Sequence, residues 1–118
     1  MAKNKKNILC YLRCWQGRTV ILHRSTLISH VVRLHLDSAF VVDELKRNFS
    51  QPICVKKNEK HGTFNAFYEI QTGKQPFLLV AVEIQGTLGK MAGKPHFIKT
   101  FYGVDSVPPP PYVWERKP

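Results

Sequence analysis

The stretch Phe77-Leu78-Leu79-Val80-Ala81-Val82-Glu83-Ile84 decides the fold, because residues 77–82 are the longest apolar run of the chain. A short and near-continuous apolar run suits a central β-strand that is covered on both faces. The run is far below the roughly 18 to 20 residues that span a bilayer, so we expect no membrane segment. The stretch predicts the central strand of a sheet.

Further strands are predicted on both sides of this stretch. Residues 53–56 read as a short strand, and residues 64–70 as an aromatic strand in which every second residue shares one face. Residues 96–103 are the last predicted strand, and a Gly- and Lys-rich loop over 86–95 precedes them. The chain from residue 53 onward therefore predicts four strands.

Two short helices are predicted before these strands. Ser and Thr at 25–26 offer an N-cap, and the apolar residues that follow, up to His35, gather on one side of a helix. A second helix is capped by Asp37 or Ser38 and is stopped by Pro52. Together with the strands, these helices predict an α+β fold.

The two ends of the chain differ in composition from the middle. Residues 1–7 are polar and basic and predict a flexible arm, whereas residues 8–24 are rich in β-forming residues and predict a loose hairpin. Residues 106–118 contain four consecutive prolines, which favours a polyproline II tail and not a packed element. Such a tail lies along its own domain or docks in an aromatic groove. We therefore expect one domain over residues 8–105, between the arm and the tail.

The charge of the chain predicts a polyanionic partner. Eighteen Lys and Arg against eight Asp and Glu give a formal net charge of +10. Such a surface concentrates phosphate-bearing ligands, and RNA is the expected partner. The N-terminal residues do not have the pattern of a signal peptide, so we expect a cytoplasmic protein.

Several classes of chemistry lack their minimum parts in this sequence. The eight carboxylates include no pair that resembles a metal cage or a glycosidase dyad, and no phosphate-binding loop, G-x-G-x-x-G or G-x-S-x-G motif is present. The three cysteines form no C-x-x-C pair and have no His at metal spacing, which argues against a disulfide framework and a zinc site. We expect no metal and no cofactor. His, Lys, Arg, Thr and Tyr remain, and they suffice to cleave RNA through its own 2′-hydroxyl, which needs a proton acceptor, a proton donor and cations around the phosphate.

The first predicted helix carries the best acid–base candidate, His30. On a helical wheel His30 lies at the edge of the apolar stripe, and Arg33, one turn further on, lies beside it and can hold a phosphate. The alternative for this pair is an ordinary boundary His and a solvated Arg. His35 falls among the apolar positions, so it is a packing or capping residue first and a catalytic residue second.

The strands supply the remaining candidates. Lys56 and Lys57 point to opposite faces at the end of a strand, so only one of them can address the site. Alternation along the last strand predicts that Thr100 and Tyr102 share one face and that Lys99 lies on the other. Lys56 and Thr100 are catalytic candidates, and Lys57, Lys99 and Tyr102 are candidates for RNA contact.

The order of these elements resembles the barnase/EndoU/colicin/RelE-like superfamily of phage- and toxin-associated nucleases. Five features carry the resemblance: His-x-x-x-x-His at 30–35, a second helix that ends near Pro52, the basic strand at 53–57, the aromatic and Val-rich strands, and Ile-x-Thr-x-Tyr at 98–102. The resemblance implies two helices packed on a roughly four-stranded antiparallel sheet, here with an N-terminal β-rich segment and a Pro-rich tail.

The resemblance also implies a function and a set of site residues. Members look like metal-independent ribonucleases, with a site that corresponds here to His30, Arg33, Lys56 or Lys57, Thr100 and Tyr102. The Pro and acidic residue that often follow the second His are Leu36 and Asp37 in this chain, so the resemblance leaves the role of His35 open.

The leading interpretation is a small endoribonuclease that cleaves structured RNA such as tRNA. It would be a toxin or a product of a phage or mobile element, with an antitoxin or immunity protein as a further partner. One alternative is a catalytically silent RNA- or DNA-binding module in which Tyr68, Phe101 or Tyr102 stacks on bases. Another is a basic protein that docks an acidic protein partner.

Overall fold

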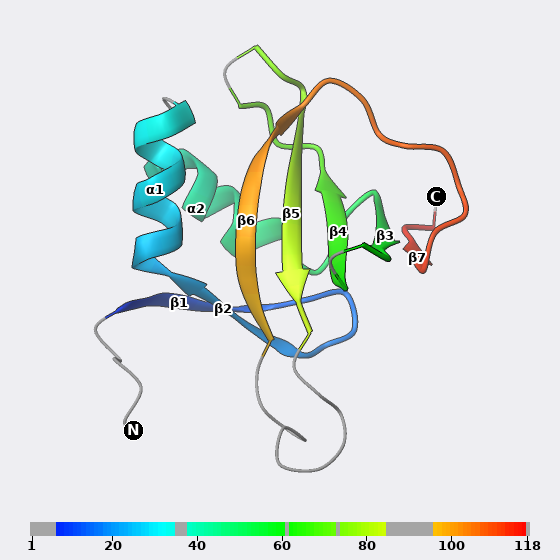
Figure 1. The fold of residues 1–118 in the computed structure, drawn as a ribbon, viewed down its shortest axis with the longest axis horizontal. Helices are drawn as coiled ribbons and strands as arrows, with labels where there is room; N and C mark the ends of the chain where they lie inside the picture. Colours follow the sequence, from blue (N-terminus) through cyan, green and yellow to red (C-terminus); the bar gives the residue numbers. More distant parts are fainter. Residues whose placement is uncertain (1–6, 35–37, 61, 73, 85–95, 118) are drawn as a thin grey trace.

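The computed structural model of the chain describes residues 7–34, 38–60, 62–72, 74–84 and 96–117. Within these residues it contains two helices and one mixed sheet of seven strands (Figure 1). The elements are, in chain order, β1 (Ile8–Arg13), β2 (Thr19–His23), α1 (Arg24–Leu34), α2 (Ser38–Asn48), β3 (Cys54–Asn58), β4 (Thr63–Tyr68), β5 (Phe77–Glu83), β6 (His96–Val104) and β7 (Trp114–Glu115). No helix in these ranges is long and apolar enough to cross a membrane.

Strand β5 is the centre of the sheet, as its apolar run predicts. It pairs antiparallel with β4 on one side and with β6 on the other. Residues 78–82 are all buried. Apolar clusters cover both faces of this strand and account for the burial. A strand that is covered on both faces does not need alternating polar and apolar residues.

The prediction of two helices on a roughly four-stranded antiparallel sheet is wrong. The strand order is β1-β2-β6-β5-β4-β3-β7, so the four strands expected from residue 53 onward are only the middle of a larger sheet. The N-terminal hairpin joins this sheet because β2 pairs parallel with β6, and the C-terminal tail adds β7 at the opposite edge. Hydrophobic patterns mark strands along the chain but do not say which strands become neighbours.

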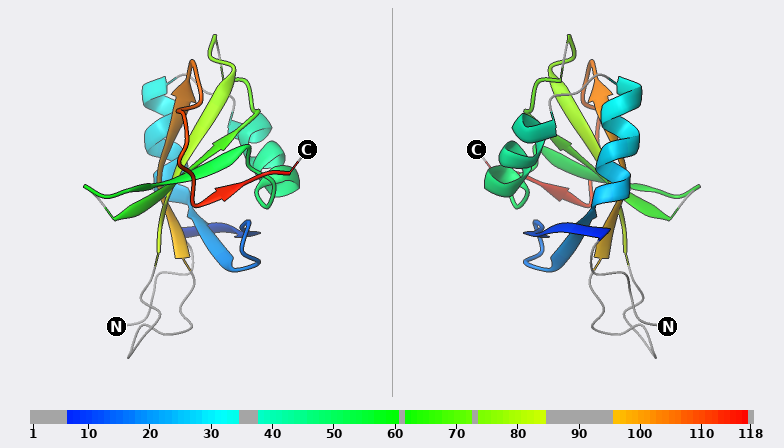
Figure 2. Two further views of the ribbon diagram at one scale, coloured as in Figure 1. Left: turned by 90° about the vertical axis from the view of Figure 1, so that its right-hand side faces the viewer. Right: turned by 90° about the vertical axis from the view of Figure 1, so that its left-hand side faces the viewer.

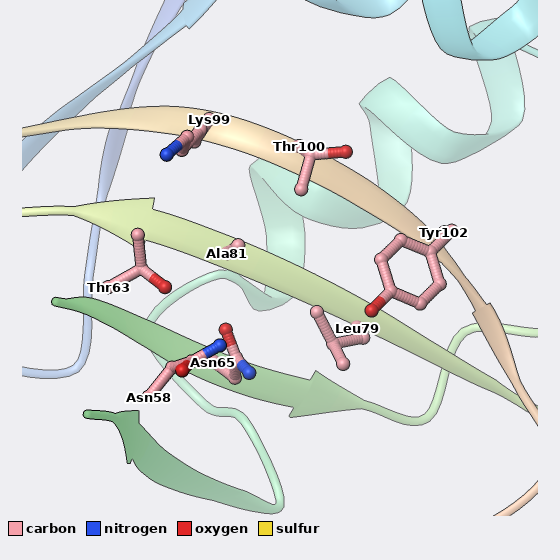
Figure 3. A pocket seen from close by; sticks show the side chains of 8 residues that line it. All are labelled: Asn58, Thr63, Asn65, Leu79, Ala81, Lys99, Thr100 and Tyr102. Atoms are coloured by element: carbon pink, nitrogen blue, oxygen red, sulfur yellow. The ribbon is translucent and has the colours of Figure 1, made fainter. Parts of the chain in front are cut away.

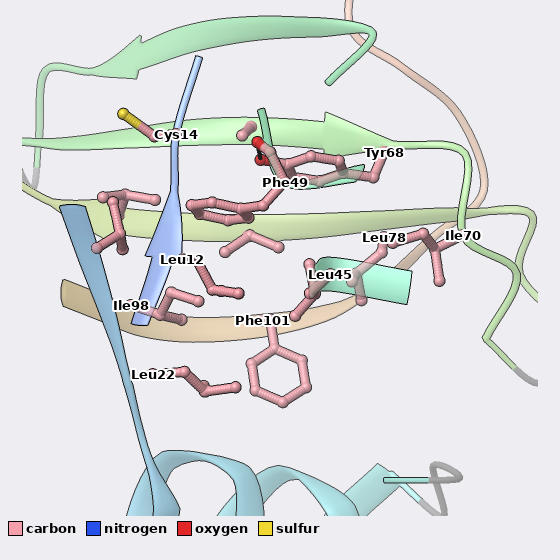
Figure 4. Close-up of a cluster of buried hydrophobic side chains, with 14 of the residues drawn as sticks. Leu12, Cys14, Leu22, Leu45, Phe49, Tyr68, Ile70, Leu78, Ile98 and Phe101 are labelled. Atoms are coloured by element: carbon pink, nitrogen blue, oxygen red, sulfur yellow. Dashed lines mark hydrogen bonds between the residues drawn. The ribbon is translucent and has the colours of Figure 1, made fainter. Parts of the chain in front are cut away.

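One face of the sheet carries the main core. Helix α2 packs against this face through Val41 and Leu45, and Phe49 joins them just beyond the end of the helix. All three are buried together with side chains of six strands, β1 to β6 (Figures 2 and 4). Helix α1 lies alongside β6 and also contacts β2 (Figure 1). Its first turn is tied to the residue before β1, because Asn7 and Ser25 exchange two hydrogen bonds of 3.1 and 3.0 Å. The rest of the predicted arm, residues 1–6, lies outside the described residues.

The end of α2 is fixed to the sheet by a tyrosine of β4. The Tyr68 hydroxyl donates a hydrogen bond of 2.7 Å to the carbonyl of Phe49, one residue beyond the helix. The two rings also stack, with 5.5 Å between their centroids (Figure 4). The last carbonyls of a helix have no partner within the helix, so Tyr68 supplies one at this position.

The C-terminal tail is packed, contrary to the expectation of an unpacked polyproline II segment. Val113 and Arg116 donate backbone hydrogen bonds to the carbonyls of Val55 and Ile53 on β3 and just before it. On the face of the sheet opposite α2, Val107 and Tyr112 pack against a second apolar cluster, which consists of Cys54, Phe67, Leu79 and Ala81. The tail therefore lies along its own domain, as one of the two alternatives predicts.

Candidate functional site

A pocket of about 260 Å³ opens on the face of the sheet opposite α2, beside the second apolar cluster (Figure 3). We call it the open-face pocket. Its floor is formed by Leu79 and Ala81 of β5. One side is lined from β6 and the other from β3 and β4, and the lining side chains are Lys99, Thr100 and Tyr102 on the first side and Asn58, Thr63 and Asn65 on the second.

A β-bulge in β6 brings the three β6 residues together. The register with β5 moves from Val82 opposite Ile98 to Ala81 opposite Thr100, so Lys99 is the extra residue. The prediction that Lys99 lies on the other face from Thr100 and Tyr102 is therefore wrong: strict alternation fails at the bulge, and all three line the pocket. Bulges often re-aim side chains in this way. After the bulge, Phe101 returns to the main core and is fully buried.

The cross-strand register places one polar residue opposite the bulge. Asn65 on β4 pairs with Ala81, and Ala81 pairs with Thr100, so the three lie in one row across the sheet. The described residues provide no hydrogen-bond partner for the Asn65 side chain. Asn58 also lines this side of the pocket and accepts a hydrogen bond of 3.1 Å from the backbone N–H of Lys60.

The register also shows which of the two β3 lysines shares this face. Lys56 pairs with Asn65 and so lies in the same row, whereas Lys57 pairs with Phe64, whose side chain packs against the main core. Lys56 is nevertheless turned toward the tail, because its Nζ donates a hydrogen bond of 2.8 Å to the carbonyl of Pro109. Asn65 and Ala81 separate it from Thr100, so Lys56 does not line the pocket.

The helix candidates are placed only in part. His30 and Arg33 belong to α1, which packs along β6, the strand that carries Lys99, Thr100 and Tyr102. The side chains of His30 and Arg33, and the whole of His35, lie outside the described part of the structure.

Two of the three aromatic candidates for base stacking are buried. Tyr68 is 1% exposed and Phe101 is 0% exposed, so neither ring can meet a ligand, and the expectation that either stacks on bases is wrong. Alternation alone could not separate them from surface residues, because aromatic strand residues occur on both faces. Tyr102 is 41% exposed and lines the open-face pocket.

The charge around the pocket comes from the β6 lysine. Lys99 is exposed and carries the positive charge among the lining residues that the structure describes. Those lining residues include no His, Asp or Glu. The imidazole of His96, also on β6, lies on the core side. Its burial, helped by the charge of Arg18, lowers its pKa. Across the described ranges, no three His, Cys, Asp or Glu side chains gather where they could hold a metal ion.

Sequence reasoning missed the β3 and β4 side of the pocket. Thr63 and Asn65 alternate with Phe64 and Ala66, and this period of two puts them on the face opposite the core. The pattern was visible in the sequence, but amides and hydroxyls on a strand do not by themselves indicate chemistry.

No protein-family model matches this chain, and no curated protein or solved structure matches it either. The resemblance to the barnase/EndoU/colicin/RelE-like superfamily therefore stays a prediction that rests on the motifs.

Proposed function

We propose that this protein is an endoribonuclease that binds RNA over the open face of its sheet and cleaves it through the 2′-hydroxyl. One observation carries the proposal. The bulge at Lys99 gathers a cation, a hydroxyl and a phenol in one pocket, on the strand along which α1 carries His30 and Arg33. The net charge of +10 supports a polyanionic substrate.

The proposed reaction divides among these groups as follows. His30 takes the proton from the 2′-hydroxyl, and the 2′-oxygen then attacks the phosphorus. The bond from phosphorus to the 5′-oxygen breaks, and the leaving oxygen takes a proton from a second group, for which the Tyr102 hydroxyl is our choice. The products are a 2′,3′-cyclic phosphate and a 5′-hydroxyl. Lys99 and Arg33 neutralise the phosphate, and Thr100 donates a hydrogen bond to a non-bridging oxygen.

Cleavage of total RNA in EDTA tests this proposal. The purified chain should produce fragments with 2′,3′-cyclic phosphate ends, and His30→Ala should lower the rate by about 10²–10⁴-fold because a positioned acid–base group contributes that much. Lys99→Ala and Lys57→Ala form a matched pair, since the two lysines are both exposed strand residues but only Lys99 lines the pocket. Lys57→Ala should cleave like the wild type, and Lys99→Ala should be slower. Undiminished cleavage by His30→Ala would show that the assignment is wrong.

A second candidate function is an RNA-binding module that does not cleave. The composition of the described pocket favours it, because amides, hydroxyls, a lysine and a tyrosine bind nucleotides well without an imidazole or a carboxylate. In the same experiment, clean protein that binds RNA and yields no cyclic-phosphate ends would support this function over cleavage.

A further inference from the structure

The open-face pocket is apolar at its floor and polar at its sides. Leu79 and Ala81 form the floor and are 7% and 6% exposed. The ring of Tyr102 extends from β6 over β5 toward Leu79 (Figure 3). Asn65 stands on the opposite side, in the row of Ala81 and Thr100. Such a surface matches a flat, apolar group with polar edges.

We propose that this pocket takes one unpaired nucleobase, which lies on the Leu79 and Ala81 floor beside the Tyr102 ring while the Asn65 amide holds its edge. The inference rests on the proposed function, because it names the part of the RNA that enters the same site. Every base has a π-face that stacks on an aromatic ring. A carboxamide offers one acceptor and two donors, and asparagine side chains hold base edges in this way.

The size and surroundings of the pocket favour a single base. Its volume of about 260 Å³ lies below the roughly 300–1,000 Å³ of sites for drug-sized ligands. The floor does not continue as open surface beyond Leu79, because Leu79 belongs to the cluster on which Val107 and Tyr112 of the tail are packed. A base within a duplex is stacked on its neighbours and paired along its edge, so only an unpaired base can enter.

The position of Lys99 places the phosphate. Lys99 and Thr100 are adjacent on β6 and line the same side of the pocket, so a phosphate attached to the bound nucleotide can meet an ammonium group there. The affinity for RNA should therefore have two separate contributions. The contribution of the base depends on the floor, Tyr102 and Asn65, and the contribution of the phosphate depends on Lys99.

Ala81→Leu separates these contributions, because the larger side chain fills the floor without changing the charge. Fluorescence anisotropy with a labelled single-stranded RNA and with its duplex, at several salt concentrations, gives both affinities. The wild type should prefer the single strand. Ala81→Leu should weaken binding of the single strand by roughly five- to 150-fold, the equivalent of one lost base stack, and should leave the salt dependence unchanged. Lys99→Ala should weaken the binding of both RNAs. It should also lower by about one the slope of the logarithm of the affinity against the logarithm of the salt concentration.

Further variants keep the test decisive. Tyr11→Ala is the matched control, because this tyrosine of β1 is 62% exposed and lies outside the pocket, and it should bind like the wild type. Tyr102→Ala should repeat the loss seen with Ala81→Leu, and since this residue is 41% exposed the variant should fold even if Ala81→Leu does not. Asn65→Ala should reduce the differences in affinity among single-base homopolymers.

The outcomes distinguish the two proposals. Wild-type protein that binds both RNAs equally well, with Ala81→Leu and Tyr102→Ala unaffected, would overturn the base pocket but leave RNA binding intact. Wild-type protein that binds neither RNA would overturn the proposed function and the base pocket together.

Discussion

Replacing Tyr68 by Phe removes one hydroxyl from the contact between α2 and the sheet. The ring and its stacking on Phe49 remain, but the Phe49 carbonyl loses the donor that lies 2.7 Å away in the core. A buried carbonyl without a partner costs about 1–3 kcal/mol. For a chain of 118 residues this corresponds to a fall of about 4–12 °C in Tm.

Urea and thermal unfolding of Tyr68→Phe, followed by circular dichroism at pH 7, measure this cost. Tyr102→Phe is the matched control: its hydroxyl belongs to a residue that is 41% exposed, so its free energy of unfolding should change by no more than about 0.5 kcal/mol. Equal stability of Tyr68→Phe and the wild type would refute the argument that this hydroxyl caps α2.

The same residue predicts a response to alkaline pH. Burial raises the pKa of Tyr68 well above its usual value of 10, and Cys14 adds to the shift. The folded state therefore holds the phenolic proton more tightly than the unfolded state, so this contribution to stability is complete below about pH 10 and is lost as the pH rises further. The free energy of unfolding of the wild type should fall more steeply above pH 10 than that of Tyr68→Phe.

Three further changes test other parts of the fold. Burial lowers the pKa of His96, so its neutral form stabilises the folded state above about pH 6.5, and this stability is lost as the pH falls. The midpoint of urea unfolding should therefore drop more between pH 7 and pH 5 for the wild type than for His96→Gln. A Cβ on Gly103 would overlap the Thr72 side chain, so Gly103→Ala should cost about 1–3 kcal/mol in urea unfolding, and adding Thr72→Ala should recover part of this loss. Lys56→Ala removes a hydrogen bond to the tail, so limited proteolysis should cut the tail faster than in Lys57→Ala, and equal rates would contradict this role.

Local patterns predicted the elements better than their arrangement. The apolar run at 77–82 became the central strand β5, and the helix expected from 25 became α1. The parallel pairing of Val20 and Ile21 with His96 and Phe97 joins strands that are more than 70 residues apart. Neither segment by itself indicates the other as its partner, because the pairing of distant strands depends on how the whole chain packs.

In the candidate site, too, neighbours along one strand could be predicted and neighbours across strands could not. Thr100 and Tyr102 could be predicted as neighbours because they are two residues apart on one strand. Lys99 joins them only because of a bulge, which the sequence does not mark with a glycine or a proline. Asn58 and Asn65 face them from strands whose distance in space depends on the register of β3, β4 and β5.

The last residues of the chain also determine what one edge of the sheet can contact. An edge strand presents backbone N–H and C=O groups that can pair with another molecule. Here Trp114 and Glu115 occupy that position beside β3, and the ion pair of Arg116 with Glu69 holds the segment in place. A chain cut after residue 105 would expose both the β3 edge and the apolar surface under the tail. The tail therefore covers the β3 edge at Cys54 and Val55, although its proline-rich composition is typical of a linker.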